Sequence, residues 1–191
     1  MRVYNPVDID DVHRKIAAAD VPHYGKYFVS VARLSGDKDI ETVLRAFDIF
    51  WQKNNRPDVY MVFVGGGDVN KYRTIADTFA SRDQIVFVGA QKNPFGFMRG
   101  ALAHILSSKA EGMGVVLVES MLAGTLNIAS DCKNGPREIL MDGAAGLLFM
   151  PGDADALAMH MENVWKNKAP IKQMIKVATQ SCTRFSAENI I

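Results

Sequence analysis

This 191-residue sequence has few cysteines, no long apolar run and little net charge. Its two cysteines, Cys132 and Cys182, form no CxxC pair, which excludes a disulfide scaffold and fits a reducing compartment. No apolar run reaches the ~18 residues that a membrane-spanning helix needs, because Glu119 and Gly124 interrupt the longest one, 115–129. The first residues lack the apolar stretch of a signal peptide. The net charge of +1 argues against a general nucleic-acid surface, so we expect no nucleic-acid partner.

Residue patterns for metal binding and nucleophilic catalysis are absent as well. The four histidines, His13, His23, His104 and His160, have no metal-ligand spacing with one another or with a cysteine, so we expect no metal site. His104 lies inside an apolar run and fits a hydrogen-bonded core histidine better than a ligand. There is no G-x-S-x-G or other nucleophile motif. With 48% hydrophobic and 23% charged residues, the chain has the composition of a globular domain, which we expect to be soluble and cytosolic.

Short apolar runs alternate with amphipathic stretches along the chain. The predicted strands cover residues 27–31, 59–64, 84–88, 103–106, 126–129 and 146–149, and several are apolar at consecutive positions, as in strands buried on both faces. The predicted helices cover residues 40–52, 68–80, 94–101, 115–123, 137–141, 153–166 and 171–180. This alternation predicts an α/β fold: a doubly wound, mainly parallel six-stranded sheet with helices on both faces.

Two cations follow the first predicted strand. In doubly wound sheets, ligands bind outside the carboxyl ends of the strands, so the loops at those ends are the first place to look for chemistry. Arg33 stands at the end of the strand, and Lys38 follows five residues later, just before a helix. A guanidinium fork and an ammonium that converge above the sheet suit a diphosphate. The alternative is that both are solvated loop charges, and their spacing alone does not decide between the two.

Three consecutive glycines follow the second predicted strand. Gly65, Gly66 and Gly67 precede Asp68, and glycine at such a place lets backbone approach a ligand closely. The dinucleotide fingerprint GxGxxG is not met, because its third glycine position is Asn70. No acid ends the next strand to hold a ribose, which argues against nicotinamide binding. The alternative is a tight turn in which Asp68 caps the following helix.

The segment 107–119 carries the most chemical information. It runs from a strand through a glycine-bracketed loop into a helix that starts near Gly114. That helix has no capping side chain and no acid in residues 115–118, so its first N–H groups and its positive dipole end can accept a phosphate. Glu111 in the loop and Glu119 inside the helix are carboxylates that can accept from sugar hydroxyls. The alternative is an ordinary loop–helix joint with two exposed acids.

The loop 129–139 follows the next strand. Its Asn134-Gly135 pair indicates a turn, and Pro136 suits the first position of a short helix. A loop at this edge of the sheet can line the same crevice, but a plain turn and helix start explains these residues equally well.

Taken in order, these segments resemble one known family. The series V-A-R-L-x3-K, V-F-V-G-G-G, V-F-V-G, S-S-x2-E-G-M-G-x4-E, A-S-D-C-x2-G-P-R-E-I and D-G-x2-G-L-L is similar to the carboxyl-terminal domain of family 4 retaining glycosyltransferases of the GT-B fold. The resemblance runs from Asn5 to about Ile190. Glu111 and Glu119 match the E-x7-E signature of the family. The NGPREIL form of the later loop is similar to enzymes that build bacterial surface polysaccharides such as lipopolysaccharide, capsule or teichoic acid.

The resemblance implies transfer of a sugar, with retention, from a nucleotide diphosphate sugar, expected to be a UDP-sugar, to a glycan or lipid-linked acceptor. Arg33, Lys38 and Glu111 match the catalytic positions: the two cations grip the diphosphate, and Glu111 contacts the transferred sugar. No metal or other cofactor is expected, because cationic side chains and a helix dipole neutralise the leaving diphosphate.

The resemblance also assigns the rest of the donor site. Glu119 matches the acid that binds the ribose hydroxyls. The backbone of Gly114, Val115 and Val116 would meet the phosphates, and the loop from Gly89 to Gln91 would frame the base. Met113 departs from the aromatic residue that is usual in E-G-F-G.

The same resemblance predicts the domain organisation. Residues 1–22 match an interdomain linker and leading helix, and residues 23–191 match the donor-binding Rossmann-like domain. An amino-terminal acceptor domain, absent from this chain, would complete the enzyme and make any peripheral contact with the inner face of the plasma membrane. We therefore expect the isolated domain to bind donor and to be inactive in transfer. Two alternatives remain open: a GT-B nucleotide-sugar epimerase or phosphorylase, and a non-catalytic partner subunit.

Overall fold

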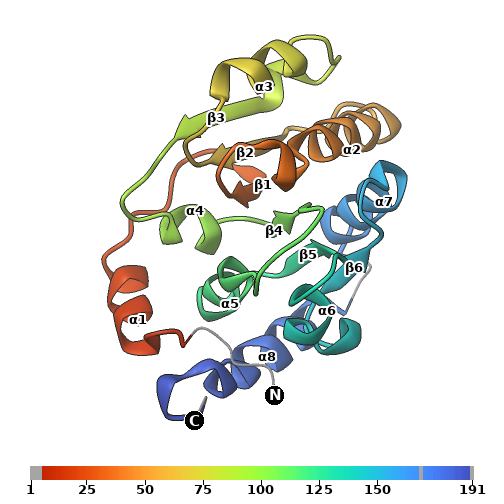
Figure 1. Ribbon diagram of the computed structural model, residues 1–191. Coiled ribbons are helices and arrows are strands. Elements are labelled where there is room, and N and C mark those ends of the chain that lie inside the picture. Colours follow the sequence, from red (N-terminus) through yellow and green to blue (C-terminus); the bar gives the residue numbers. More distant parts are fainter. Residues whose placement is uncertain (1–5, 168–169, 190–191) are drawn as a thin grey trace.

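The computed structural model describes residues 6–167 and 170–189, and its six strands form one sheet in the order β3-β2-β1-β4-β5-β6 (Figure 1). Every neighbouring pair of strands is parallel. The strands are β1 (Lys26–Val31), β2 (Val59–Val64), β3 (Ile85–Gly89), β4 (Ala103–Leu106), β5 (Asn127–Ser130) and β6 (Leu147–Phe149). The predicted fold class is confirmed. Residues 1–5 of the predicted linker, and the two final residues, lie outside the described part of the chain.

Helices connect successive strands, as the alternation of patterns predicts. The α-helices are α1 (Ile9–Ala17), α2 (Ile40–Lys53), α3 (Val69–Ala76), α4 (Phe95–Arg99), α5 (Val115–Leu122), α6 (Pro136–Ile139), α7 (Ala154–Trp165) and α8 (Ile171–Ser181). Short 3₁₀ turns cover Gly36–Lys38, Arg82–Gln84, Met141–Gly143, Cys182–Phe185 and Ala187–Asn189. Helix α3 ends four residues before its predicted end at residue 80. It ends early because the N–H groups of Thr78 and Phe79 bond to carbonyls three residues back, which tightens the last turn.

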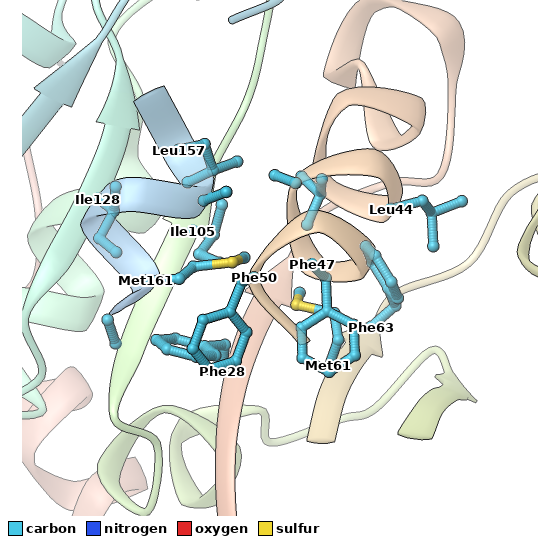
Figure 2. Packing of buried hydrophobic residues seen from close by; sticks show 14 of the residues in the cluster. Phe28, Leu44, Phe47, Phe50, Met61, Phe63, Ile105, Ile128, Leu157 and Met161 are labelled. Atoms are coloured by element: carbon cyan, nitrogen blue, oxygen red, sulfur yellow. The ribbon is translucent and has the colours of Figure 1, made fainter. Parts of the chain in front are cut away.

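One face of the sheet is covered by α2, α3 and α7. In α2 the side chains predicted to share a face, Ile40, Val43, Leu44, Phe47 and Trp51, are all buried there. Figure 2 shows the aromatic rings of α2 beside the sheet and the residues of α7 that complete this cluster. Each large side chain buried in this way stabilises the fold by about 1.5–3 kcal/mol. The 3.6-residue period of α2 thus sets which of its faces meets the strands.

The opposite face is covered by α4 and α5, with α1 and α8 packed outside them (Figure 1). Two side chains from the β3–β4 connection hold the carboxyl end of α1: Asn93 Nδ2 donates to the Lys15 carbonyl at 2.8 Å, and Arg99 donates to the Ala19 carbonyl at 3.1 Å. The first of these bonds satisfies a carbonyl that a helix end leaves unpaired, and the second holds the residue that follows the cap of α1. Helix α1, predicted as the leading helix, is therefore packed on the same body as the sheet. Within the part of the chain that the structure describes, no helix combines the length and the apolar composition of a membrane span.

The glycine run after β2 packs against the backbone of the loop after β1. The Leu34 N–H donates to the Gly66 carbonyl at 2.7 Å, and a Cβ at Gly65 would overlap the carbonyl oxygen of Ala32. Asp68 caps α3 by accepting from the Lys71 N–H at 3.1 Å. The tight-turn alternative for this segment is thus confirmed, because the close approach that requires glycine is between two segments of the chain itself.

His104 is fully buried in the middle of β4. Its Nδ1 lies 2.9 Å from Oδ1 of Asn127, and no group of the described chain meets hydrogen-bond geometry at its Nε2. The Asn127 amide nitrogen donates to the Leu117 carbonyl, so Oδ1 accepts and the neutral ring carries its proton on Nδ1. Burial lowers the pKa of His104 from 6.5 to about 4. The prediction of a hydrogen-bonded core histidine is confirmed at one of its two nitrogens.

This histidine predicts an acid-sensitive stability. Between pH 6.5 and 4 the unfolded chain binds a proton at His104 that the folded chain does not. The free energy of unfolding therefore falls as the pH drops through that window, by about 3 kcal/mol in total. Urea unfolding at a series of pH values measures this slope. We expect His104→Leu to flatten it and the exposed control His13→Gln to leave it unchanged; equal slopes in His104→Leu and the unmodified chain would contradict the assignment.

Candidate functional site

A pocket of about 320 Å³ opens at the carboxyl ends of the strands. Its volume lies in the ~300–1,000 Å³ range of small-molecule sites. Four of the predicted site residues line it: Arg33 after β1, Gln91 after β3, and Val116 and Glu119 of α5. The remaining lining residues are Val31, Ala32, Val64, Gly65, Ala90 and Pro94. The topology thus brings together residues from the loops after β1, β2 and β3 and from helix α5 at the edge of the sheet where the sequence predicts a ligand.

Lys38 and Glu111 do not line this pocket, but they contact each other. The Lys38 ammonium donates to Glu111 Oε1 at 2.6 Å, and the two side chains are 22% and 11% exposed. The hydroxyl of Ser108 donates to the same oxygen at 2.5 Å. A carboxylate so little exposed needs a charged partner and further hydrogen bonds, and here it has both. The pair joins two of the three predicted catalytic positions directly, whereas Arg33 is exposed at the mouth of the pocket.

Helix α5 begins at Val115 with an open first turn. Gly114 precedes it at φ +83°, a left-handed conformation that favours glycine. Among the described residues, no side chain accepts a hydrogen bond from this turn and no acid lies in it. The turn combines free N–H donors with the positive end of the helix dipole, and the second residue of α5, Val116, lines the pocket. Gly89 closes β3 directly before the pocket residue Ala90, and its carbonyl accepts from the Gly65 N–H.

Burial sets the electrostatics of Glu119. It raises the pKa of this carboxyl above its ordinary value, and the positive charge of Lys15 on α1 acts in the opposite direction. Lys15 itself is paired with Asp11. Helix α1 therefore contributes a cation to the surroundings of a predicted site residue, a contribution that the sequence pattern does not predict.

Three buried serines that were not predicted as site residues, Ser107, Ser108 and Ser130, connect the segments around the site. Ser107 donates to the Lys38 carbonyl at 2.6 Å, which ties the loop after β4 to the loop after β1. Ser130, the last residue of β5, donates to the Ser108 carbonyl at 2.6 Å, which ties the end of this strand to the loop after β4. Hydroxyls at buried positions near the ends of apolar strands were the available signal, because such groups require partners.

The loop after β5 reinforces this connection through its backbone. The Glu111 N–H donates to the Lys133 carbonyl at 3.3 Å, and a Cβ at Gly135 would overlap the carbonyl oxygen of Met113. Pro136 occupies the first turn of α6, which confirms the expected turn and helix start. This loop supports the Glu111 loop, and none of its residues lines the pocket.

The described residues contain no group of three or more His, Cys, Asp and Glu side chains that could hold a metal ion. Within the site Lys38 is paired with Glu111, and its ammonium also lies 3.8 Å from a carboxylate oxygen of Asp37. The site thus offers cations, an open helix N-terminus and two carboxylates, which together suit a ligand that carries both phosphate and hydroxyl groups.

Comparison with known proteins identifies the family. The family profile described as "Glycosyl transferases group 1" matches residues 11–181. The chain belongs to this family. This glycosyltransferase domain is 28% identical to the lipopolysaccharide 1,6-galactosyltransferase of Salmonella typhimurium, over 85% of this chain and 45% of that protein. It is 26% identical to the N-acetylgalactosamine-N,N'-diacetylbacillosaminyl-diphospho-undecaprenol 4-alpha-N-acetylgalactosaminyltransferase of Campylobacter jejuni, over 87% of this chain and 47% of that protein.

Solved structures share the fold of this glycosyltransferase domain. The Anabaena protein HepE, in complex with UDP-glucose, superposes with a TM-score of 0.81 at 20% identity, covering 98% of this chain and 54% of that one. The chain spans less than half the length of each of the two curated relatives. The resemblance to GT-B glycosyltransferases is thus confirmed for the family and the fold.

Proposed function

We propose that this chain is the carboxyl-terminal, donor-binding domain of a family 4 retaining glycosyltransferase that takes its sugar from a UDP-sugar. The observation that carries the proposal is the pocket in which Arg33, Gln91 and Glu119 meet beside the open first turn of α5. The complex of HepE with UDP-glucose supports the choice of nucleotide. The names of the two relatives support a glycan or lipid-linked acceptor and a role in bacterial surface polysaccharide synthesis.

In this proposal each part of the donor, the diphosphate, the ribose, the base and the transferred sugar, is held by different groups. Arg33, Lys38 and the first N–H groups of α5 neutralise the diphosphate, whose charge grows as the bond to the sugar breaks. Glu119 accepts from the ribose hydroxyls, and the loop from Gly89 to Gln91 frames the base. Glu111 accepts from hydroxyls of the transferred sugar. The cations and the helix dipole take over the neutralisation that a metal ion provides elsewhere, so the reaction needs no metal.

The proposal includes a second domain. The extra length of the curated relatives would correspond to an amino-terminal acceptor domain. Residues 1–22 would connect to that domain, and residues 23–191 would form the donor domain. That half would bind the acceptor and make any contact with the cytoplasmic face of the membrane. The 191-residue chain is then a donor binder with little or no transfer activity of its own.

Binding of UDP tests the proposal at Glu119. We expect the chain to bind UDP more tightly than 2′-deoxy-UDP, by about tenfold, because hydrogen bonds to a charged group are among the stronger ones. Glu119→Gln should lower UDP affinity and remove this preference. The control Asp155→Asn changes charge equally at an exposed position of α7 and should alter neither. Titration calorimetry that detects no UDP binding by the folded chain at millimolar concentration would contradict the proposed function.

A further inference from the structure

Ser107 and Ser108 are adjacent in the chain, and their hydroxyls act on different charged residues of the site. Both serines are buried, with 2% and 0% of their surface exposed. Ser107 donates to the backbone carbonyl of Lys38 at 2.6 Å. Ser108 donates to the side-chain oxygen Oε1 of Glu111 at 2.5 Å. One dipeptide at the end of β4 therefore holds both members of the Lys38–Glu111 ion pair.

The two contacts differ in what they constrain. The Ser107 bond ends on backbone, so it holds the loop after β1 in place whichever way the Lys38 side chain points. The Ser108 bond ends on the carboxylate itself, at the same oxygen that Lys38 contacts. When a diphosphate draws the Lys38 ammonium away, Ser108 still holds Glu111 Oε1. A carboxylate that is 11% exposed would otherwise lose both its orientation and its remaining hydrogen-bond donor.

The loop around Ser108 is itself held from two sides. The Ser108 carbonyl accepts from the buried Ser130 hydroxyl at 2.6 Å, and the Lys109 N–H donates to the Asp37 carbonyl at 2.9 Å. Neither bond uses the Ser108 hydroxyl, so replacing Ser108 with alanine leaves both intact. The same replacement at Ser107 also removes one oxygen and leaves these two bonds. The two serines thus form a matched pair for mutation.

From this division we infer that Ser108 is a positioning residue for recognition of the transferred sugar, acting through Glu111, while Ser107 acts through Lys38 on the diphosphate. The inference rests on the proposed function, because it takes Glu111 as the group that contacts the sugar. Ser108 fixes Oε1 and leaves Oε2 to accept from a sugar hydroxyl. The ratio of affinities for UDP-sugar and UDP therefore depends on Ser108 and does not depend on Ser107.

Calorimetry on the 191-residue chain tests this with five probes: UDP, UDP-glucose, UDP-galactose, UDP-N-acetylglucosamine and UDP-N-acetylgalactosamine. Ser108→Ala is expected to weaken the tightest-binding UDP-sugar about tenfold and to change UDP affinity less than twofold. Ser107→Ala is expected to weaken UDP and that UDP-sugar by the same factor. In a Glu111→Gln background, Ser108→Ala should no longer change the ratio, because the group through which it acts is gone.

The possible outcomes distinguish a failure of the proposed function from a failure of the inference about Ser107 and Ser108. Failure of the unmodified chain to bind UDP overturns the proposed function, and this inference with it. UDP binding without binding of any of the four UDP-sugars overturns the inference alone. So does a Ser108→Ala variant that weakens UDP and UDP-sugar equally, or one that changes neither. A ratio that shifts in Ser108→Ala and stays constant in Ser107→Ala supports the inference, because a general structural effect of losing a buried hydroxyl would be common to both variants.

Discussion

Replacing Lys38 with methionine is expected to weaken UDP binding by about 10- to 100-fold, since a charge-assisted hydrogen bond to phosphate is lost. Methionine keeps most of the length of the side chain and removes its charge. The change also leaves the Glu111 carboxylate, 11% exposed, without its cation and close to the arriving diphosphate. Repulsion between the two anions adds to the loss. Calorimetric titration with UDP at fixed ionic strength measures the effect.

Lys109→Met is the matched control for this variant. Lys109 lies in the loop after β4 but is 64% exposed, and its ammonium is 3.9 Å from a carboxylate oxygen of Asp39. The variant changes the net charge by the same amount near the same site. We expect it to alter UDP affinity by less than about threefold, because exposed charges are screened by solvent and salt. Equal losses in the two variants would indicate a general charge effect and would contradict a specific role for Lys38.

Replacing Gly135 with alanine is expected to lower the free energy of unfolding by about 3–5 kcal/mol, a large fraction of the stability of an ordinary domain. Two costs add. Gly135 has φ +106°, where a side chain is strained, and its new Cβ would overlap the carbonyl oxygen of Met113. That carbonyl belongs to backbone, so relief requires the two loops to separate. Urea unfolding measures the loss.

Gly143→Ala separates these two costs. Gly143 has φ +99°, close to that of Gly135, but a Cβ there would meet open space. The control therefore carries the conformational strain alone, for which we expect about 1–2 kcal/mol. Equal losses in the two variants would show that the contact between the loops after β4 and β5 is not tight. A larger loss in Gly135→Ala would support the role of this contact in holding the Glu111 loop.

Local patterns predicted the secondary structure because its causes are local. The period of apolar residues from Ile40 to Trp51 identifies the buried face of α2 before any partner is known. The absence of a cap at Gly114 is equally visible in the sequence, since capping depends on a few neighbouring residues. The end of α3 at Ala76 was not predicted. The helix ends there because the N–H groups of Thr78 and Phe79 donate to carbonyls three residues back. No glycine or proline in the sequence marks this helix end.

The glycine run illustrates an alternative that local reasoning left open. The sequence permits both a ligand and a chain segment to approach Gly65 closely. The structure places the backbone of Ala32 there, the residue that directly follows β1. Such a choice depends on which strands are neighbours, and β2 lies next to β1 only in the folded sheet.

By itself, the sequence determined the order and type of the elements and the chemical character of the loops: cations after the first strand, glycines after the second and carboxylates around the start of α5. Only the tertiary structure decided which of these groups meet. It brings Glu119 into one pocket with Arg33 and Gln91, and it pairs Lys38 with Glu111, 73 residues away, with Ser108 on the same oxygen. The physical reason is that periodicity and capping act within a few residues, whereas contacts across the chain follow from strand order and register, which no local pattern encodes.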